Sequence, residues 1–283
     1  MTEGLFVVHK PAGITSHDVV DAVRRHAETR KVGHAGTLDP MATGVLLVGV
    51  GRATRLLRYL SGLDKEYEGT GRLGVETNTL DADGEVVREA PVDDVTREEL
   101  ELALSSRVGE IEQLPPSYSA VKVGGQKLYR AARKGVIVEA PPRRVRVDAL
   151  DLLASDSPEF DFRIRCSSGT YVRAFVADVG RELGCGANLA RLIRTRIGPF
   201  GLDRAVPVDA LGEPLPVEAA VAHLPSVRLE EEEATAASHG RCLAPAGIDG
   251  PYAVFGPADR LIGMWRDRDA QACPDMVLPP PAD

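Results

Sequence analysis

The spacing of apolar residues predicts a short strand followed by a helix at the start of the chain. Residues 5–8, LFVV, form an apolar run typical of a buried strand, and the Pro-Ala-Gly turn after it ends that strand. Thr15 with Asp18 three positions later resembles a capping box, and Val19, Val20 and Val23 then fall on one face of a helix reaching about His26. A second strand is expected over residues 45–50 and a short helix over 52–60.

The clearest amphipathic helix is expected near residue 172. Its apolar positions recur at i, i+3, i+4, i+7 and i+11, namely Val172, Phe175, Val176, Val179 and Leu183. Ser168 or Thr170 could cap its start, and Gly184 could end it. Arg173 then lies in the first turn, where a cation opposes the helix dipole at a cost of about 0.3–1 kcal/mol. The residues alone leave two explanations open, a carboxylate partner or plain solvent exposure.

Alternating apolar and polar positions predict strands between these helices. Residues 160–166 alternate as in a half-buried strand, and residues 141–153 also favour a strand. Residues 69–74, GTGRLG, match the glycine spacing of a dinucleotide-binding loop, but a turn and a short strand follow instead of a helix, so a hairpin is the better interpretation. The Asp-Ala-Asp-Gly sequence after it is interpreted as a turn. A helix is expected over residues 96–107.

The last sixty residues predict a small separate module. Residues 207–224 are broken by prolines and resemble a linker. Short strands follow, with one helix over 230–239 whose acidic residues lie at the N-terminus, where the dipole favours them. Residues 252–265 predict a hairpin with a Gly-Pro turn. A barrel-like arrangement of these strands is expected.

Composition places the 283-residue chain among ordinary globular proteins, with 43% hydrophobic and 27% charged residues. The N-terminus lacks the basic and apolar regions of a signal peptide, and no apolar stretch approaches the length of a membrane span. The four cysteines are far apart and form no CxxC pair, so we expect reduced, buried thiols. They are Cys166, Cys185, Cys242 and Cys273.

The charge distribution is more informative than the formal net charge of −8. Residues 118–147 hold eight Lys or Arg against one acid, and residues 163–204 hold eight Arg against three acids. The acids gather in residues 64–101 and 225–283. Since a polyanion responds to local potential, the two basic segments suggest a phosphate-binding face, with solvated helix faces as the alternative.

Candidate chemistry centres on residues 31–44, KVGHAGTLDPMATG, a glycine-rich segment interpreted as a loop. Asp39 precedes a proline, which favours an extended backbone, and the neighbouring glycines allow close approach to a ligand. Asp39 could be a nucleophile or a base, or it could bond only to its own turn. His34 could instead be a structural hydrogen-bonding residue, and Tyr67 could be an aromatic residue of a strand. No P-loop or GxSxG sequence is present, and no motif indicates a metal site.

Five segments together resemble the TruB family of tRNA pseudouridine synthases, in order and spacing, over about residues 4–204. The segments are KPAGITSHDVV, KVGHAGTLDPMATGVLLVGVGRATR, KEYEGTGRLGVETNTLDADG, LPPSYSAVKVGGQKLYRAARKG and SSGTYVRAFVADVGRELG. The resemblance implies an α+β pseudouridine synthase fold, with a central mixed, largely antiparallel sheet flanked by helices. It implies a catalytic domain over residues 1–222, with an RNA-gripping insertion at about 115–143, and a PUA-like β-barrel module over 223–283.

The resemblance also implies an activity and roles for individual residues. The enzyme would isomerise uridine 55 in the T loop of tRNA by flipping the base out and exchanging its C–N glycosidic bond for a C–C bond. The resemblance implies no cofactor and no metal. Asp39 matches the catalytic acid, Arg173 its partner, and Tyr67 the aromatic that stacks on the uracil. Tyr171 and Leu192 match residues of the uridine pocket, and His34 fills the gap that the flipped base leaves. Lys10, Lys122, Arg143 and Arg144 are expected to contact RNA.

The resemblance implies a cytoplasmic, monomeric enzyme whose partner is the T arm of tRNA, with no protein or membrane partner. One departure is the acidic run Glu230–Glu233, which leaves the contribution of the C-terminal module to RNA binding open. Two other functions remain as alternatives. One is an RNA-binding protein without catalysis, and the other is a nucleotide-dependent oxidoreductase built on residues 69–74.

Overall fold

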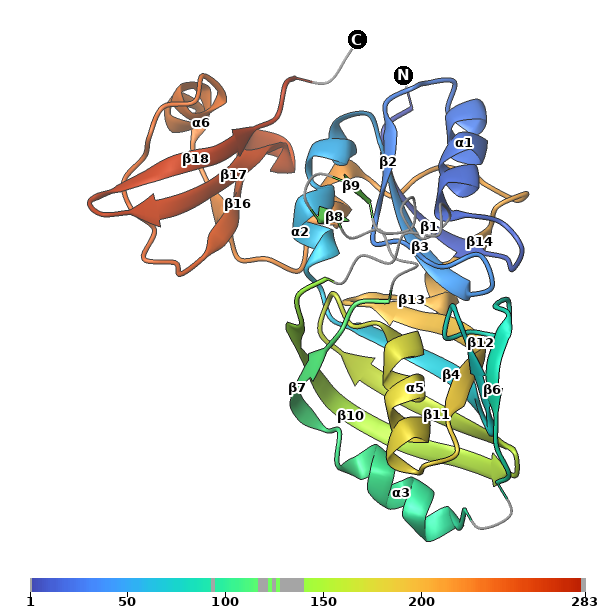
Figure 1. Ribbon diagram of the computed structural model, residues 1–283. Coiled ribbons are helices and arrows are strands. Elements are labelled where there is room, and N and C mark those ends of the chain that lie inside the picture. The colour runs from blue at the N-terminus through green and yellow to red at the C-terminus, as the bar shows by residue number, and fades with distance from the viewer. Residues whose placement is uncertain (1, 93–94, 117–121, 124–125, 128–139, 281–283) are drawn as a thin grey trace. The chain divides into compact units, whose positions relative to one another are not determined.

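The computed structural model describes residues 2–92, 95–116, 122–123, 126–127 and 140–280, with the backbone alone for 122–123 and 126–127. The chain divides into two compact units. The first unit comprises Met1–Asp39, Val45–Gly62 and Gly198–Asp283, and the second comprises Pro40–Gly44 and Leu63–Ile197. Figure 1 labels the elements in both units.

The first unit is built on strands β1 (Gly4–Lys10) and β3 (Thr43–Val50), which are neighbours in one sheet. β1 also pairs in parallel with β14 (Val206–Pro207), and β2 (Val32–Ala35) pairs antiparallel with β3. The predicted helix is confirmed as α1 (Ser16–His26), with the Thr15–Asp18 capping box present. Its valines are buried against Phe6, Leu46 and Val48 of the strands. The remaining elements of this part are one short helix, one short strand and three 3₁₀ turns: α2 (Leu57–Ser61), β13 (Phe200–Gly201), η1 (Gly51–Arg55), η2 (Leu202–Arg204) and η3 (Val217–Ala220).

The prediction that residues 31–44 form one loop is wrong for its first part. Residues 32–35 are strand β2, and His34 lies opposite Val48 of β3 in the antiparallel register. Only the turn after β2 is irregular. Its glycine Gly36 has φ of +87°, a left-handed backbone that favours glycine. The hydrogen bonds of β2 to a buried strand outweigh the low strand propensity of its glycine.

The second unit is an antiparallel sheet with strands in the order β12-β4-β11-β10-β7, joined in parallel by the first two residues of β3. The strands are β4 (Lys65–Leu73), β7 (Gly109–Gln113), β10 (Arg143–Asp156), β11 (Glu159–Cys166) and β12 (Ala187–Ile197). Helix α5 (Val172–Glu182) lies across one face of this sheet, and α3 (Arg97–Ser105) lies at one end of the sheet, as Figure 1 shows. Smaller pairs are β5 (Val75–Thr77) with β6 (Val86–Glu89) and β8 (Lys122–Val123) with β9 (Gln126–Lys127). The expected mixed, largely antiparallel sheet with helices is confirmed.

The glycines of residues 69–74 serve packing inside the sheet. Gly69 and Gly71 lie within β4, between β11 and β12, and no helix follows. A Cβ on Gly69 would meet the ring of Phe162 at 2.7 Å, and one on Gly71 would meet the ring of Phe160 at 2.3 Å. The two aromatic rings therefore require glycine here, and the dinucleotide-binding interpretation is excluded for this segment.

The C-terminal residues form the expected small β module. Its sheet has the order β15-β16-β17-β18, and helix α6 covers a core around Trp265, Tyr252 and Val254. The first turn of α6 holds Glu231, Glu232 and Glu233, as predicted. The bounds are β15 (Ser226–Arg228), α6 (Glu231–Ser238), β16 (Pro251–Phe255), η4 (Pro257–Asp259), β17 (Leu261–Arg268) and β18 (Gln271–Val277).

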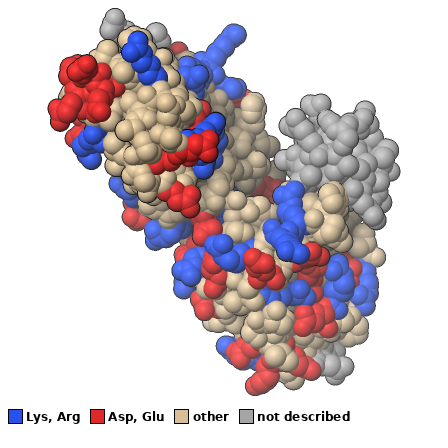
Figure 2. Space-filling model, turned by 90° about the vertical axis from the view of Figure 1, so that its left-hand side faces the viewer, with Lys and Arg blue, Asp and Glu red and all other residues tan. Residues whose placement is uncertain are grey.

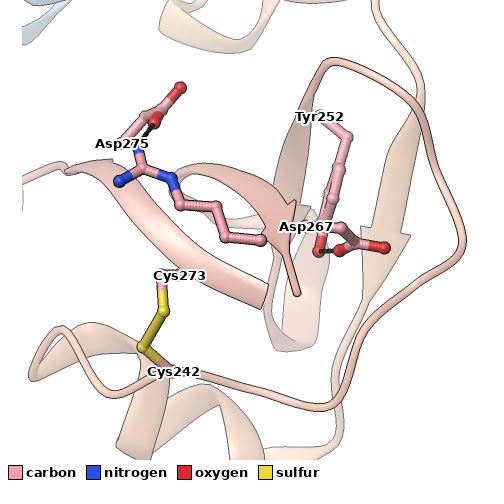
Figure 3. The surroundings of a disulfide bond; sticks show 6 residues. Cys242, Tyr252, Asp267, Cys273 and Asp275 are labelled. Carbon is pink, nitrogen blue, oxygen red and sulfur yellow. Dashed lines mark hydrogen bonds and ion pairs between the residues drawn. A yellow bond between two sulfur atoms is a disulfide. The ribbon is translucent and has the colours of Figure 1, made fainter. Parts of the chain in front are cut away.

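A disulfide joins Cys242 to Cys273 in this module, as Figure 3 shows. The expectation of four unpaired thiols is therefore wrong for these two cysteines and right for the buried Cys166 and Cys185. The two cysteines are 31 residues apart, and no local pattern in the sequence connects them. They meet because the hairpin of β17 and β18 brings residue 273 back to the loop after α6. A bridge between Leu243 and Ala272 fixes the same approach.

Candidate active site

Asp39 lies on a short, pinned connection between β2 and β3. Ser16, at the start of α1, accepts a hydrogen bond from the Leu38 N–H at 2.8 Å and donates its hydroxyl to the Leu38 carbonyl at 3.0 Å. Ser16 is 2% exposed, so this pair of bonds is shielded from water. The residue just before Asp39 is thus fixed to a helix terminus, and Asp39 itself is half-buried. A carboxylate on such a pinned turn loses little conformational freedom when it acts on a substrate.

Lys10, expected to contact RNA, is fully buried at the end of β1. Its ammonium donates to the carbonyls of Pro11 at 2.8 Å and Ile14 at 2.7 Å. These bonds hold the turn that leads to the Thr15 cap of α1. The described contacts of Lys10 therefore shape the turn, and its contact with RNA stays a prediction.

Arg173 occupies the second residue of α5, in the first turn, as predicted, and it is only 4% exposed. Its guanidinium donates to the Thr79 carbonyl at 2.7 Å and lies 3.3 Å from the Asp81 carboxylate. Of the two explanations that the sequence left open, the structure shows the carboxylate partner and not solvent exposure. A buried ion pair of this kind holds a charge in one position, since removing either partner leaves the other without compensation.

The Asp81 turn is anchored so that its carboxylate faces Arg173. One carboxylate oxygen accepts from the Thr79 hydroxyl at 2.5 Å and from the Asp83 N–H at 3.2 Å, and the other faces the arginine. The backbone on both sides of Asp81 bonds to Leu189 of β12. Leu80 adopts φ of +65°, a strained value for a non-glycine residue that costs about 1–2 kcal/mol. Strain of this kind clusters at functional sites.

Sequence reasoning missed Asp81. The Asp-Ala-Asp-Gly sequence predicts a turn, and the turn chemistry is present. Nothing in the spacing distinguishes the buried Asp81, at 6% exposure, from the exposed Asp83 two residues later. The only available signal was the unfavourable place of Arg173 on its helix, which called for a carboxylate without naming it.

Tyr67 and Leu192 lie on neighbouring strands of the second unit. Tyr67 of β4 is opposite Arg194 of β12, and Leu192 is opposite Gly69, so the two pocket candidates are diagonal neighbours. Tyr67 and Leu192 are each 7% exposed, and Arg194 is 1% exposed. The structure thus brings the Tyr67 and Leu192 candidates together at one place on the sheet.

Lys65 adds a buried cation on the same strand, two residues before Tyr67. It is 6% exposed and donates to the Leu63 carbonyl at 2.6 Å. Burial, with a contribution from the nearby charge of Arg194, lowers the pKa of Lys65 to about 8. Its cross-strand neighbour Cys166 is fully buried, and burial raises the pKa of that thiol to about 11.

Tyr171 is the N-cap residue of α5, half-buried, with no side-chain capping bond. The prediction of Ser168 or Thr170 as cap is wrong, since the helix starts closer to Arg173. The Thr170 hydroxyl instead donates to the Ser167 carbonyl at 3.0 Å. The backbone of Tyr171 is bonded to the side chain of Gln113, and the Arg143 guanidinium lies 5.5 Å from the centre of the Tyr171 ring.

Four of the eight arginines in the basic segment 163–204 pair with carboxylates, so the phosphate-binding face stays a prediction for this segment. These pairs are Arg163–Glu68, Arg173–Asp81, Arg181–Asp178 and Arg191–Asp161. Figure 2 shows basic and acidic side chains interspersed over the faces that it presents. Arg163 and Glu68 are directly opposite on neighbouring strands, where opposite charges stabilise each other, whereas Arg181 and Asp178 lie three positions apart on one helix.

Most of the expected insertion, residues 115–143, lies outside the described residues, as does the side chain of Lys122. Arg144 is described, and its side chain is 80% exposed, 3.7 Å from Glu112. An exposed pair at that distance contributes little, so Arg144 can exchange this partner for a phosphate. The contact of the insertion with RNA stays a prediction.

Asp39 belongs to the first unit, whereas Arg173, Tyr67, Tyr171 and Leu192 belong to the second. The pairing of Asp39 with Arg173 and the role of His34 therefore stay predictions. Within the described residues, no group of three or more His, Cys, Asp or Glu side chains could hold a metal ion. No helix in the same part of the chain is long and apolar enough to span a membrane.

Comparison with known proteins identifies related sequences along the whole chain. The N-terminal domain of the TruB family pseudouridylate synthases matches residues 24–172, and the tRNA pseudouridine synthase II C-terminal domain matches residues 224–279. The tRNA pseudouridine synthase B of Mycobacterium sp. (strain KMS) is 48% identical over 98% of this chain and 96% of its own. That of Thermobifida fusca (strain YX) is 45% identical over 98% and 99%, respectively.

Solved structures extend the similarity to the fold. A chain in the crystal structure of a Cbf5-Nop10-Gar1 complex superposes with a TM-score of 0.76 at 28% identity, covering 98% of this chain and 85% of that one. A chain of an H/ACA RNP bound to a substrate RNA containing 2′-deoxyuridine gives 0.75 at 25% identity, with the same coverage. On the sequence matches and the fold together, the chain belongs to the TruB family of pseudouridylate synthases.

Proposed function

We propose that this protein is a tRNA pseudouridine synthase that converts uridine 55 of the T loop to pseudouridine. The observation that carries the proposal is the match, over nearly the full length of both chains, to relatives named tRNA pseudouridine synthase B. The reaction is an isomerisation. The base leaves the sugar carbon through N1 and returns through C5, the hydrogen on C5 is lost, and one appears on N1. Atoms and electrons balance without a co-reactant.

We propose Asp39 as the catalytic acid that makes glycosidic cleavage possible, with Arg173 as its partner. The burial of Arg173 and its bonds to Asp81 and Thr79 support a fixed cation at this place. A guanidinium held in position stabilises a carboxylate that develops or changes charge during the reaction.

Tyr67, Tyr171 and Leu192 would hold the flipped uracil, and Tyr67 would relay the C5 proton. Flipping a base costs a few kcal/mol, and aromatic stacking returns about 1–3 kcal/mol per base. The closeness of Tyr67 and Leu192 on neighbouring strands supports a shared pocket wall. His34 would fill the space that the base vacates.

We propose catalytic and C-terminal domains over residues 1–222 and 223–283, and a monomer that acts on the T arm of tRNA in the cytoplasm. Residues 115–143, with Lys122, Arg143 and Arg144, would grip the RNA, and Lys10 would also contact it. The exposure of the Arg144 side chain supports its part in this. Recognition through loop shape, flipped bases and phosphates is typical of proteins that bind folded RNA.

The decisive experiment compares the wild type with Asp39→Asn on an unmodified T-arm hairpin, detecting pseudouridine by carbodiimide modification and primer extension. Asp209→Asn is the matched control, because Asp209 is an exposed carboxylate of the same unit. We expect a stop at position 55 with the wild type and the control and none with Asp39→Asn, while all three bind the hairpin. Full activity of Asp39→Asn would refute the role of the carboxylate. A wild type that binds the hairpin but forms no pseudouridine would favour the non-catalytic alternative.

A further inference from the structure

A side chain that no motif points to, Gln113, holds the backbone of Tyr171. Its amide oxygen accepts from the Tyr171 N–H at 3.0 Å, and its amide nitrogen donates to the Tyr171 carbonyl at 3.2 Å. A glutamine side chain carries the same donor and acceptor as a peptide group. It therefore pairs with both sides of Tyr171 as a neighbouring strand would.

The setting makes these two hydrogen bonds rigid. Gln113 is the last residue of β7 and is 1% exposed, so water does not compete for its amide. Tyr171 is the N-cap residue of α5, and its carbonyl also accepts from the Phe175 N–H at 3.0 Å in the first turn of the helix. Fixing the N–H and the carbonyl of one residue fixes its φ and ψ, and hence the direction in which its Cα–Cβ bond points.

A second residue acts on the ring. Arg143, the first residue of β10, is the cross-strand partner of Gln113, and its guanidinium carbon lies 5.5 Å from the centre of the Tyr171 ring. A cation within about 6 Å of a ring centre is attracted to its face. Gln113 therefore fixes the backbone of Tyr171, and Arg143 contacts one face of its ring. The two residues lie opposite each other, where β7 ends and β10 begins.

We propose that Gln113 is a positioning residue for the reaction, which sets the direction of the Tyr171 ring toward the flipped uridine. The inference rests on the proposed function, in which Tyr171 lines the uridine pocket. A ring held in one direction meets the base without reorganisation. We therefore expect Gln113 to affect the rate constant of the reaction in the enzyme–RNA complex more than the affinity for RNA.

The test uses Gln113→Met, which keeps the length of the side chain and removes both hydrogen bonds, and Gln113→Glu, which keeps the acceptor and loses the donor. Gln271→Met is the matched control, since Gln271 is an exposed residue of the C-terminal module. Single-turnover rate constants at saturating enzyme, dissociation constants for an unmodified tRNA transcript, and melting temperatures would be measured for all variants.

We expect the rate constant to fall at least tenfold in Gln113→Met and by less in Gln113→Glu, with the dissociation constant within about threefold of the wild type. In a Tyr171→Ala background, Gln113→Met should lower the rate no further, because the ring that it positions is gone. A purely structural residue would lower the melting temperature in both backgrounds and leave the rate of the folded enzyme unchanged.

An unchanged rate constant in the folded Gln113 variants, or an effect confined to the dissociation constant, would overturn the proposal. If Gln113→Met does not fold, Gln113→Glu with the Tyr171→Ala comparison decides the question on the same grounds. Failure of the wild type and Gln271→Met to form any pseudouridine would instead refute the proposed function, and the inference with it.

Discussion

The buried pair of Arg173 and Asp81 offers the sharpest test of how the site is held. Asp81→Asn keeps the shape of the side chain and an oxygen that can accept hydrogen bonds from Thr79 and Asp83, and it removes only the charge. The two partners lie 3.3 Å apart at exposures of 4% and 6%. At an effective dielectric constant of about 20, two unit charges at that distance attract by about 5 kcal/mol.

The net loss is smaller, because the variant keeps the hydrogen bond of Arg173 to the Thr79 carbonyl. Removing one partner of a buried pair typically destabilises a protein by about 3–5 kcal/mol, and we expect the lower end, about 3 kcal/mol. For a chain of this size each kcal/mol shifts the melting temperature by about 2–4 °C, so a decrease of about 6–12 °C is expected. The rate of pseudouridine formation should also fall at least tenfold, since Arg173 loses a group that orients it.

Thermal melting followed by circular dichroism, together with the single-turnover assay, measures both effects. Asp83→Asn is the matched control, because Asp83 lies in the same turn and is exposed. It should melt within about 1 °C of the wild type and keep full activity. A melting temperature of Asp81→Asn equal to that of the control would refute the view that this ion pair holds the arginine in place.

Two further predictions concern Lys65 and the disulfide. The pKa of Lys65 in the folded protein, about 8, lies below its usual 10.5. Protonation of Lys65 therefore lowers the free energy of unfolding, with no loss above pH 10.5 and the full loss once the pH has fallen below 8. In urea titrations, the free energy of unfolding of Lys65→Met relative to the wild type should rise by up to about 3 kcal/mol as the pH falls from 10.5 to 7. A difference that stays constant with pH would contradict this. Reducing Cys242–Cys273, which closes a 31-residue separation, should destabilise the C-terminal module by about 3–4 kcal/mol. The fluorescence of Trp265, the chain's one tryptophan, reports this, and an unfolding midpoint insensitive to reductant would disprove it.

Local patterns predicted the elements whose causes are local. The Thr15–Asp18 capping box and the valines after it specify α1 within the span of the helix itself, and the five apolar positions from Val172 to Leu183 do the same for α5. The hairpin of β16 and β17 needed only its turn and two apolar runs. The residues that set the buried face are at most eleven positions apart in the two helices, and the paired residues of the hairpin are at most fifteen apart, so the sequence contains the information in readable form.

The failures have a common physical origin in distant partners. Residues 32–35 became a strand because β3 offered it hydrogen bonds, and Tyr171 became the N-cap because Gln113, far earlier in the chain, satisfies its backbone. Arg163 pairs with Glu68, an acid that lies 95 positions earlier in the chain and opposite it on a neighbouring strand. Propensity and local charge are weak compared with contacts that only the folded chain supplies.

By itself, the sequence determined the order of the elements, the candidate residues and, through the five matching segments, the family. It also indicated that Arg173 required compensation. Tertiary structure decided which acid provides it, since only the turn anchored on β12 distinguishes the buried Asp81 from Asp83. It likewise decided the disulfide and the support of Tyr171 by Gln113. Each of these depends on which residues become neighbours across a sheet, and the pairing of strands far apart along the chain leaves no periodic trace in the sequence.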